Sequence, residues 1–301
     1  MFKKKIINIK DKKYNLKTIG DFENFIKIQQ KENEQHLKLK KHLNNTMKAC
    51  YVSDIHLEFL KEFPIINNNA DILILAGDIG NPYEDIYKDF IIDVSNKFKK
   101  IFLITGNHEY YGHKESIENV DNYIDTFIKK ENMNNVIFLN NNHCDYNGFR
   151  FIGSTLWSKI LNLNSPKYDL TNCFNCIKDF KINKKEGINK YNNLFQNNYE
   201  YLNNTINKTT EESDLPIIVI THHLPSYKLI APKYQGYDMN QCFASNCEEL
   251  MKNQVKYWFY GHTHTEGDTI INNTRLLCNP LGYPDENTDV NMNKIIILEN
   301  T

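Results

Sequence analysis

The stretch Ile72-Leu-Ile-Leu-Ala-Gly77-Asp78 is a short apolar run that ends in a glycine and an aspartate. An apolar run of this length without a polar break is typical of a strand buried on both faces of a sheet. A glycine lets the chain turn sharply at the end of such a strand, because it has no Cβ. We therefore expect Asp78 at the carboxyl end of a buried strand, where open α/β sheets bind ligands.

Four other segments have the same design, an apolar run that leads into polar residues of the kinds that bind metals. They are Tyr51-Val-Ser-Asp54-Ile-His56, Leu103-Ile-Thr-Gly106-Asn107-His108-Glu109, Val219-Ile-Thr-His222-His223 and Phe259-Tyr-Gly261-His262-Thr-His264. An Asp-x-His or a Gly-Asp alone is common in proteins without a metal, whereas His-x-His and Gly-Asn-His-Glu at strand ends are less common. The occurrence of five in one chain, all at predicted strand ends, predicts that they converge on one crevice.

Helical patterns alternate with these runs. Apolar residues recur at helical spacing in three segments: Ile86, Phe90, Val94 and Phe98; Ile117, Val120, Ile124 and Phe127; and Tyr191, Phe195, Leu202 and Ile206. Further strands are expected at Val136–Leu139, Phe149–Gly153, Arg275–Cys278 and Ile295–Leu298. The alternation predicts an α/β fold with layered sheets covered by helices. The segment from Ile160 to Gly187 has no clear period, and we expect a long surface insertion there.

The charge is unevenly distributed. The formal net charge is -1, but residues 1–46 carry about seven more lysines than acidic residues, and residues 47–301 have an excess of about eight acidic residues. We expect residues 1–46 to be a basic extension, partly helical or disordered, and residues 47–301 to be the functional domain. The extension is either a solvated arm or a docking segment for a protein or nucleic acid partner.

The composition excludes several classes of protein. No apolar run approaches the roughly 18 residues of a membrane span, and no signal-peptide pattern follows the first lysines. The seven cysteines are scattered, as in a protein with free thiols. We therefore expect a cytoplasmic protein with no membrane partner.

The polar residues at the strand ends offer carboxylate oxygen, imidazole nitrogen and amide oxygen, but no thiolate. This set suits Zn, Fe or Mn. Seven such ligands are too many for one ion, but they suit two ions that share a bridging carboxylate and a bridging hydroxide. That arrangement serves in-line displacement at phosphorus.

The ordered motifs D-x-H, G-D, G-N-H-E, a strand-borne H and G-H-x-H, between Met47 and about Asp289, resemble the calcineurin-like metallophosphoesterase superfamily. Gly153-Ser-Thr-Leu-Trp157 and Asn279-Pro-Leu-Gly-Tyr283 look like its bacterial-type branch rather than the protein Ser/Thr phosphatases. The resemblance implies a layered β-sandwich of mixed sheets flanked by helices. It also implies a metal-dependent hydrolase that attacks a phosphoester with a metal-bridging hydroxide.

The resemblance implies that two ions of Mn, Fe, Zn or Ni are the cofactors. One ion would be bound by Asp54, His56, Asp78 and His264, and the other by Asp78, Asn107, His222 and His262. His222 is preferred to His223 because it directly ends its strand and stands two residues before a Leu-Pro step. His223 either faces the substrate or is a solvated loop histidine.

His108 is not a ligand in the family pattern. The resemblance implies that it assists the leaving group as a proton donor. In some relatives an aspartate three residues after the bridging aspartate orients this histidine, but Asn81 occupies that position here. We therefore expect a lower pKa for His108.

A small phosphoester is the expected substrate, and several residues are candidates to contact it: Tyr110, Tyr111, His113, Trp157, His223, Asn246 and Tyr283. Two other functions are compatible with the sequence. One is a scaffold without turnover, although such members typically lose ligands and this chain has them all. The other is a nuclease recruited by the basic extension, whose binding to nucleic acid would fall steeply with salt.

Overall fold

The computed structural model describes residues 5–9, 12–16, 20, 24–31, 46–112, 114–161, 184–286 and 290–300. The chain divides into two units, Met1–Thr46 and Met47–Thr301. In the first unit, β1 (Lys5–Ile9) pairs antiparallel with β2 (Lys12–Leu16), and residues 24–31 are helical. On this helix Ile26 and Ile28 are exposed. The rest of the lysine-rich segment lies outside the described residues.

The second unit contains two sheets. Their strands are β3 (Thr46–Val52), β4 (Ile72–Ala76), β5 (Lys100–Ile104), β6 (Val136–Phe138), β7 (Asn142–Tyr146), β8 (Phe149–Ser154), β9 (Ile217–Thr221), β10 (Val255–Phe259), β11 (Gly267–Ile271), β12 (Thr274–Cys278) and β13 (Ile295–Glu299). The five-stranded sheet has the order β13-β3-β4-β5-β6, with β3 to β6 parallel. The six-stranded sheet has the order β11-β12-β10-β9-β8-β7, with parallel strands in its middle and antiparallel strands β11 and β7 at its edges.

Both faces of the central strands are buried, which explains their unbroken apolar sequences. On β4, Ile72 and Ile74 belong to a cluster that also contains Phe151 and other residues of the second sheet, so this cluster fills the space between the sheets. Leu73 and Leu75 point the other way and belong to a separate cluster with the helices. Successive residues of a strand face opposite sides, so one strand serves both cores.

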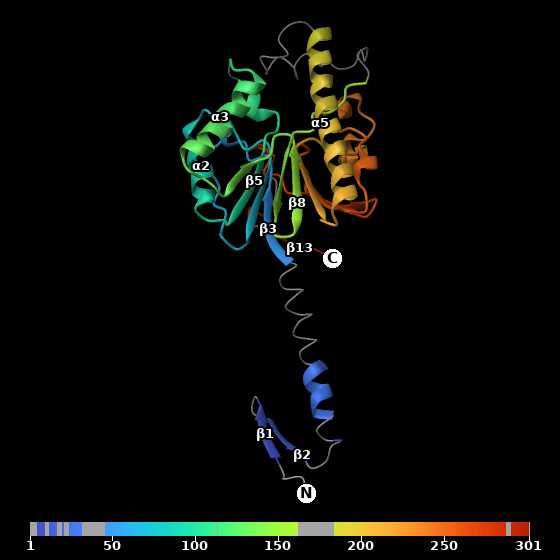
Figure 1. Ribbon diagram of the computed structural model, residues 1–301. Helices are drawn as coiled ribbons and strands as arrows, with labels where there is room; N and C mark the ends of the chain where they lie inside the picture. Colours follow the sequence, from blue (N-terminus) through green and yellow to red (C-terminus); the bar gives the residue numbers. More distant parts are fainter. Residues whose placement is uncertain are drawn as a thin grey trace. The chain divides into compact units, whose positions relative to one another are not determined.

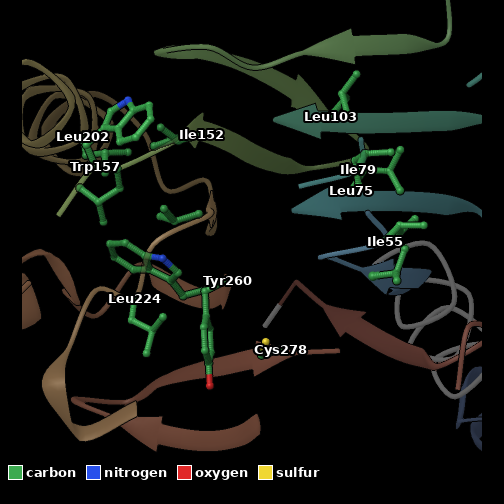
Figure 2. Close-up of a cluster of buried hydrophobic side chains, with 14 of the residues drawn as sticks. Ile55, Leu75, Ile79, Leu103, Ile152, Trp157, Leu202, Leu224, Tyr260 and Cys278 are labelled. Carbon is green, nitrogen blue, oxygen red and sulfur yellow. The ribbon is translucent and has the colours of Figure 1, made fainter. Parts of the chain in front are cut away.

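Three helices cover the outer faces. α2 (Asp85–Ser95) and α3 (Ile117–Lys130) lie on one flank of the sheets and α5 (Lys184–Glu212) lies on the other (Figure 1). Figure 2 shows the outward-facing Leu75 and Leu103 on one side, and Trp157 packed near Leu202 of α5 on the other. The predicted layered β-sandwich flanked by helices is confirmed, with mixed strand directions in the six-stranded sheet.

Two edge strands, β7 and β11, were not predicted. Their residues are mostly polar or exposed, because an edge strand has one open side and little buried surface. Turn signals mark both hairpins: Asn147-Gly148 and Asn272-Asn273 all have positive φ, as tight two-residue hairpin turns require. The asparagine-rich loops of this chain thus contain hairpin turns.

The predicted surface insertion at Ile160–Gly187 is wrong at both ends. Ile160 is buried, and residues 184–187 form the first turn of α5. The missing helical period has a simple cause, since Gly187 and neighbouring lysines obscure the apolar stripe at the start of this helix. Residues 162–183, the middle of the predicted insertion, lie outside the described residues.

Candidate metal centre

The five motif-bearing strands come from both sheets. β3, β4 and β5 belong to the five-stranded sheet, and β9 and β10 belong to the six-stranded sheet. Their carboxyl ends meet in one place, because side chains that follow β3 and β4 lie within ligand distance of side chains that follow β9 and β10. The predicted convergence on one crevice is therefore found, and the junction of two sheets forms it.

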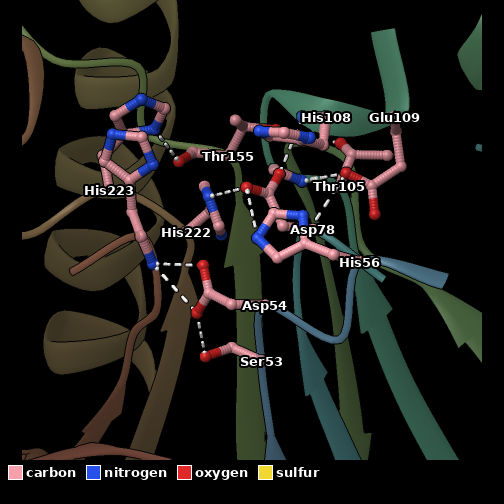
Figure 3. Close-up of polar contacts among 12 residues, drawn as sticks. Ser53, Asp54, His56, Asp78, Thr105, His108, Glu109, Thr155, His222 and His223 are labelled. Carbon is pink, nitrogen blue, oxygen red and sulfur yellow. Dashed lines mark hydrogen bonds and ion pairs between the residues drawn. The ribbon is translucent and has the colours of Figure 1, made fainter. Parts of the chain in front are cut away.

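Three groups of side chains there could each hold a metal ion. In each group the ligand atoms all lie within 4.8 Å of one another. The groups are Asp54, His56 and His264; His56, Asp78 and His108; and Asp78, His222 and His262. Asp78 belongs to two of them, as a bridging carboxylate would (Figure 3). Asn107, whose amide oxygen could bind a metal, is buried and lines the same cavity as Asp78 and His262.

The backbone at this centre is strained. Five of the seven predicted ligands, Asp54, His56, Asp78, His262 and His264, have φ between 45° and 67°. Residues other than glycine rarely adopt this left-handed conformation, which costs roughly 1–3 kcal/mol each and persists only where the surroundings enforce it. Such strain clusters at functional sites, because it aims side chains that a relaxed chain would direct elsewhere.

Two glycines allow the strand ends to approach each other. Gly77 has a φ of 84°, and a Cβ on it would lie 2.7 Å from Nδ1 of His222. A Cβ on Gly106 would overlap the carboxylate of Asp78 and lie 2.7 Å from the His222 ring. Close packing therefore requires both glycines, and the turn at positive φ also requires Gly77.

Two of the proposed histidine ligands, His222 and His264, are oriented by hydrogen-bond partners on Nδ1. Nδ1 of His222 lies 3.0 Å from the backbone oxygen of Ala76, and Nδ1 of His264 is bonded to the Glu286 carboxylate. A ring whose Nδ1 donates in this way presents the lone pair of Nε2, which is the usual arrangement of metal-binding histidines. The Nε2 atoms of His56 and His264 lie 3.0 Å apart and face each other.

Two buried polar atoms of the centre have no hydrogen-bond partner. They are Oδ1 of Asn107 and Nε2 of His222. Nε2 of His222 does lie 3.1 Å from Oδ2 of Asp78, but without hydrogen-bond geometry. Because an unpaired buried polar atom is costly, this pair beside a carboxylate fits the binding of a cation.

The electrostatics of the centre also fit a cation. Burial alone would raise the pKa of Asp78, but the neighbouring His222 and His108 hold that pKa well below its usual range. Burial alone would lower the pKa of His222, but the Asp78 and Asp54 carboxylates raise it to about 9. The carboxylates thus attract positive charge strongly, and a divalent cation competes with these protons for the same place.

His108 differs from the proposed ligands because both of its ring nitrogens have partners that lie outside the proposed ligand set. Nδ1 lies 2.8 Å from Oε1 of Glu58, and Nε2 lies 3.0 Å from the hydroxyl of Tyr283. Burial alone would lower the pKa of His108, but Asp78 and Glu58 raise it. The expected lower pKa is therefore wrong, because Glu58 supplies the carboxylate that Asn81 lacks.

Asn81 has a different structural part. Its side chain bonds to Glu84 and accepts a hydrogen bond from the backbone N–H of Tyr83, so it caps the approach to α2. Sequence reasoning missed Glu58, which stands two residues after His56. The sequence did contain a signal for it. Asp54, His56 and Glu58 stand at alternate positions, so Glu58 is a third residue with a metal-binding or charged side chain directly after the same strand.

Glu109 is the last residue of the G-N-H-E motif, but no function was predicted for it. Its buried carboxylate accepts hydrogen bonds from the backbone N–H groups of Asp78, Ile79 and Gly106. It therefore ties the turn after β4 to the turn after β5. Burial, together with the nearby Asp78, raises the pKa of Glu109.

The predicted substrate residues separate into three sets. Tyr111, Trp157, His223 and Tyr283 line the cavity that contains the centre. Tyr110 is instead a core residue, because its side chain is buried and its hydroxyl bonds to Thr105 and Asp121. Asn246 is exposed and does not line this cavity, and His113 lies outside the described residues.

His223 is a buried residue, so its interpretation as a solvated loop histidine is wrong. Burial, together with the neighbouring His262 and His222, holds the pKa of His223 well below its usual range. Its ring lies 5.4 Å from that of Trp157, between centroids. It therefore stands as a neutral side chain beside the centre.

Comparison with known proteins adds to this geometry. Residues 47–266 match the family model described as calcineurin-like phosphoesterase. The chain is 30% identical over 265 residues to the uncharacterized protein L509 of Acanthamoeba polyphaga mimivirus, a match that covers 80% of this chain and 93% of that protein. Its fold is similar to that of the phosphopantetheinyl hydrolase of Mycobacterium tuberculosis, with a TM-score of 0.56 and 14% identity over 80% of this chain and 91% of that one.

Proposed function

The chain belongs to the calcineurin-like phosphoesterase family, and we propose that it hydrolyses a small phosphoester at a centre of two metal ions. One observation carries this proposal above the others. Six of the seven proposed ligands, from both sheets, belong to overlapping groups whose donor atoms lie close together. Five of these ligands are on strained backbone, and His222 and Asn107 have buried polar atoms without a hydrogen-bond partner. A protein that bound no cation would not retain this combination of costs.

We propose Asp54, His56, Asp78 and His264 as ligands of one ion, and Asp78, Asn107, His222 and His262 as ligands of the other. Proximity alone would also admit His108, which forms a group with His56 and Asp78. The partners of its two ring nitrogens, Glu58 and Tyr283, both lie outside the ligand set, so we assign it a different role.

The two ions, when bound, supply activation of the attacking water and neutralisation of charge on the phosphoryl group. The chain's own residues position the ester. His108 lines the cavity next to Asp78, and its backbone N–H donates to Oδ1 of Asp78 at 2.7 Å. Its imidazolium, which Glu58 favours, is placed to give a proton to the leaving oxygen.

The test is reconstitution of the full chain, separately with Mn, Zn, Fe and Ni, followed by assays on phosphomonoesters, diesters and nucleotides. Metal content is measured in parallel. We expect about two ions per chain and turnover with at least one metal. Asp78→Asn, which removes a charge shared by both sites, is expected to lower metal content and to reduce kcat by 100-fold or more.

Asp85→Asn is the matched control, because Asp85 is a highly exposed carboxylate on the neighbouring helix. This variant is expected to behave like the wild type. Full activity in Asp78→Asn, or no turnover with any of the four metals, would contradict the proposed hydrolase.

A further inference from the structure

A cavity of about 520 Å³ extends from the candidate metal centre. It begins at Asp78, Asn107 and His108, so the centre forms one end of it. This volume lies in the range of pockets that enclose a small organic molecule, and a phosphate group fills only a small part of it. The remainder therefore has room for the organic group of a phosphoester.

The wall beyond the centre is mostly apolar and aromatic. One part comes from Trp157 and Ile160, which follow β8, and from Tyr191 of α5. Another part comes from the segment of residues 227–243, which follows β9. This segment forms the short 3-10 helices η4 (Tyr227–Leu229), η5 (Pro232–Tyr234) and η6 (Asp238–Cys242). This segment connects β9 to η7 (Glu248–Leu250) and β10 and bears no predicted ligand.

The aromatic surface begins directly at the candidate metal centre. The ring of Phe243 lies 4.7 Å from that of His262, and the ring of Tyr111 lies 4.6 Å from that of His108, between centroids. Farther out, Tyr234 and Tyr237 line the same cavity and are partly open to solvent. An organic group attached to the bound phosphate would contact aromatic rings from its first atoms onward.

The charge of the wall limits what can bind there. Among the described residues that line the cavity there is no lysine or arginine, and Asp78 and Glu286 are the carboxylates. A second phosphate or a carboxylate on the substrate would lose its hydration beside Glu286, and no described lining residue outside the metal centre would offer it a positive charge. An uncharged organic group meets no such penalty.

On the premise of the proposed function, we propose that the substrate is a phosphoester whose organic group is uncharged and apolar or aromatic. The phosphate lies at the metal centre and the organic group occupies the cavity between the residue 227–243 segment and Trp157. Esters that carry additional anionic groups, nucleic acid strands included, are poor substrates.

The test compares three phosphate esters of primary alcohols with the metal-loaded full chain. They are ethyl phosphate, 2-phenylethyl phosphate and 3-phosphooxypropanoate, whose leaving groups have similar intrinsic reactivity. We expect kcat/KM for the phenylethyl ester to exceed that for the ethyl ester by about tenfold or more. The carboxylate ester is expected to fall below the ethyl ester.

Two variants locate the effect. Phe243→Ala removes the ring next to the centre, and Tyr234→Ala removes a ring that is partly exposed to solvent. Each is expected to reduce the preference for the phenylethyl ester several-fold. Tyr227→Ala is the matched control, because Tyr227 belongs to the same segment but does not line the cavity, and the preference is expected to persist in it.

The outcomes separate the two proposals. Turnover of all three esters with equal kcat/KM, or faster turnover of the carboxylate ester, would overturn the substrate class and leave the hydrolase intact. A preference that survives in both ring variants would also overturn it. Absence of turnover with any ester and any metal would instead remove the proposed function, and this inference with it.

Discussion

At the scale of single residues, the environment of His108 depends on Glu58. The two side chains are 2.8 Å apart, and Glu58 also lies 3.3 Å from Nδ1 of His56. One carboxylate thus contacts a proposed ligand and the proposed proton donor. Because Glu58 is mostly buried with both histidines, its negative charge acts on them with little screening.

We predict that Glu58→Gln slows hydrolysis of poor leaving groups most. The glutamine keeps a hydrogen-bond acceptor but removes the charge that favours the His108 imidazolium. Turnover of ethyl phosphate should fall about ten- to a hundredfold, while p-nitrophenyl phosphate, whose leaving group needs no proton, should be affected much less. The measurement is kcat/KM for both esters, with metal content determined in each sample.

Glu62→Gln is the control, since Glu62 is an exposed carboxylate four residues farther along the chain. His108→Ala should reproduce the same dependence on leaving group. An equal loss on both esters in Glu58→Gln would mean that Glu58 acts through the His56 ligand or the local structure, and not through His108.

At the scale of elements, the Asp121 carboxylate of α3 forms hydrogen bonds to the loops near the centre. Asp121 accepts hydrogen bonds from the hydroxyl of Tyr110 at 2.7 Å and from Nδ2 of Asn140 at 2.6 Å. Tyr110 belongs to the 3-10 helix η2 (His108–Tyr110), directly after the proposed ligand Asn107. Burial raises the pKa of Asp121 to about 6, although both hydrogen bonds oppose that rise.

This pKa predicts a pH dependence of stability. In the unfolded chain Asp121 should titrate near 4, so between about pH 4 and 6 the folded state holds more protons than the unfolded state. The stabilisation of the folded state that comes from the raised pKa of Asp121 is then complete below pH 4, and it is lost as the pH rises through 6. The free energy of unfolding of wild type minus that of Asp121→Asn should fall by up to about 3 kcal/mol over this range.

Urea unfolding at several pH values measures this difference. Asp125→Asn serves as control, because Asp125 lies one turn farther along α3 in a surface pair with Lys129. This variant reports the effect of removing a carboxylate from the surface of the same helix. A difference that stays constant with pH for Asp121→Asn would show that Asp121 titrates alike in the folded and unfolded chains.

Some helices and strands could be predicted from the sequence pattern, and others could not. The apolar runs at Ile72–Ala76 and Ile217–Thr221 have the same bounds as β4 and β9. The three helical stripes lie in α2, α3 and α5, except that Phe98 follows the end of α2. Strands with two buried faces and helices with one leave clear apolar patterns. β7 and β11 leave none, because their pairing is set by a hairpin turn and a neighbouring strand instead of by burial.

At the scale of the whole molecule, the proposed active site belongs to the second unit alone. The family match begins at residue 47, and every described residue of the proposed centre follows it. Among the described helices, none combines the length and the apolar character needed to cross a bilayer. We propose residues 47–301 as the phosphoesterase domain, with residues 1–46 as an extension that is not needed for chemistry.

A chain that begins at residue 45, so that β3 stays whole, tests this division. We expect it to unfold cooperatively, with a midpoint close to that of the full chain, and to keep the same metal-dependent kcat. Unfolding is followed by circular dichroism and activity by the best ester found. A chain that aggregates, or that loses most of its activity, would show that residues 1–44 complete the domain.

The sequence by itself determined which donors exist and that they end buried strands, because donor type and apolar periodicity are local properties of the chain. Only the tertiary structure decided that two sheets bring these donors together, that Glu58 and not residue 81 faces His108, and that rings from residues 227–243 line the cavity. The physical reason is that these contacts join residues far apart in the chain. The packing of the layers sets the distances between such residues, and a local sequence pattern does not.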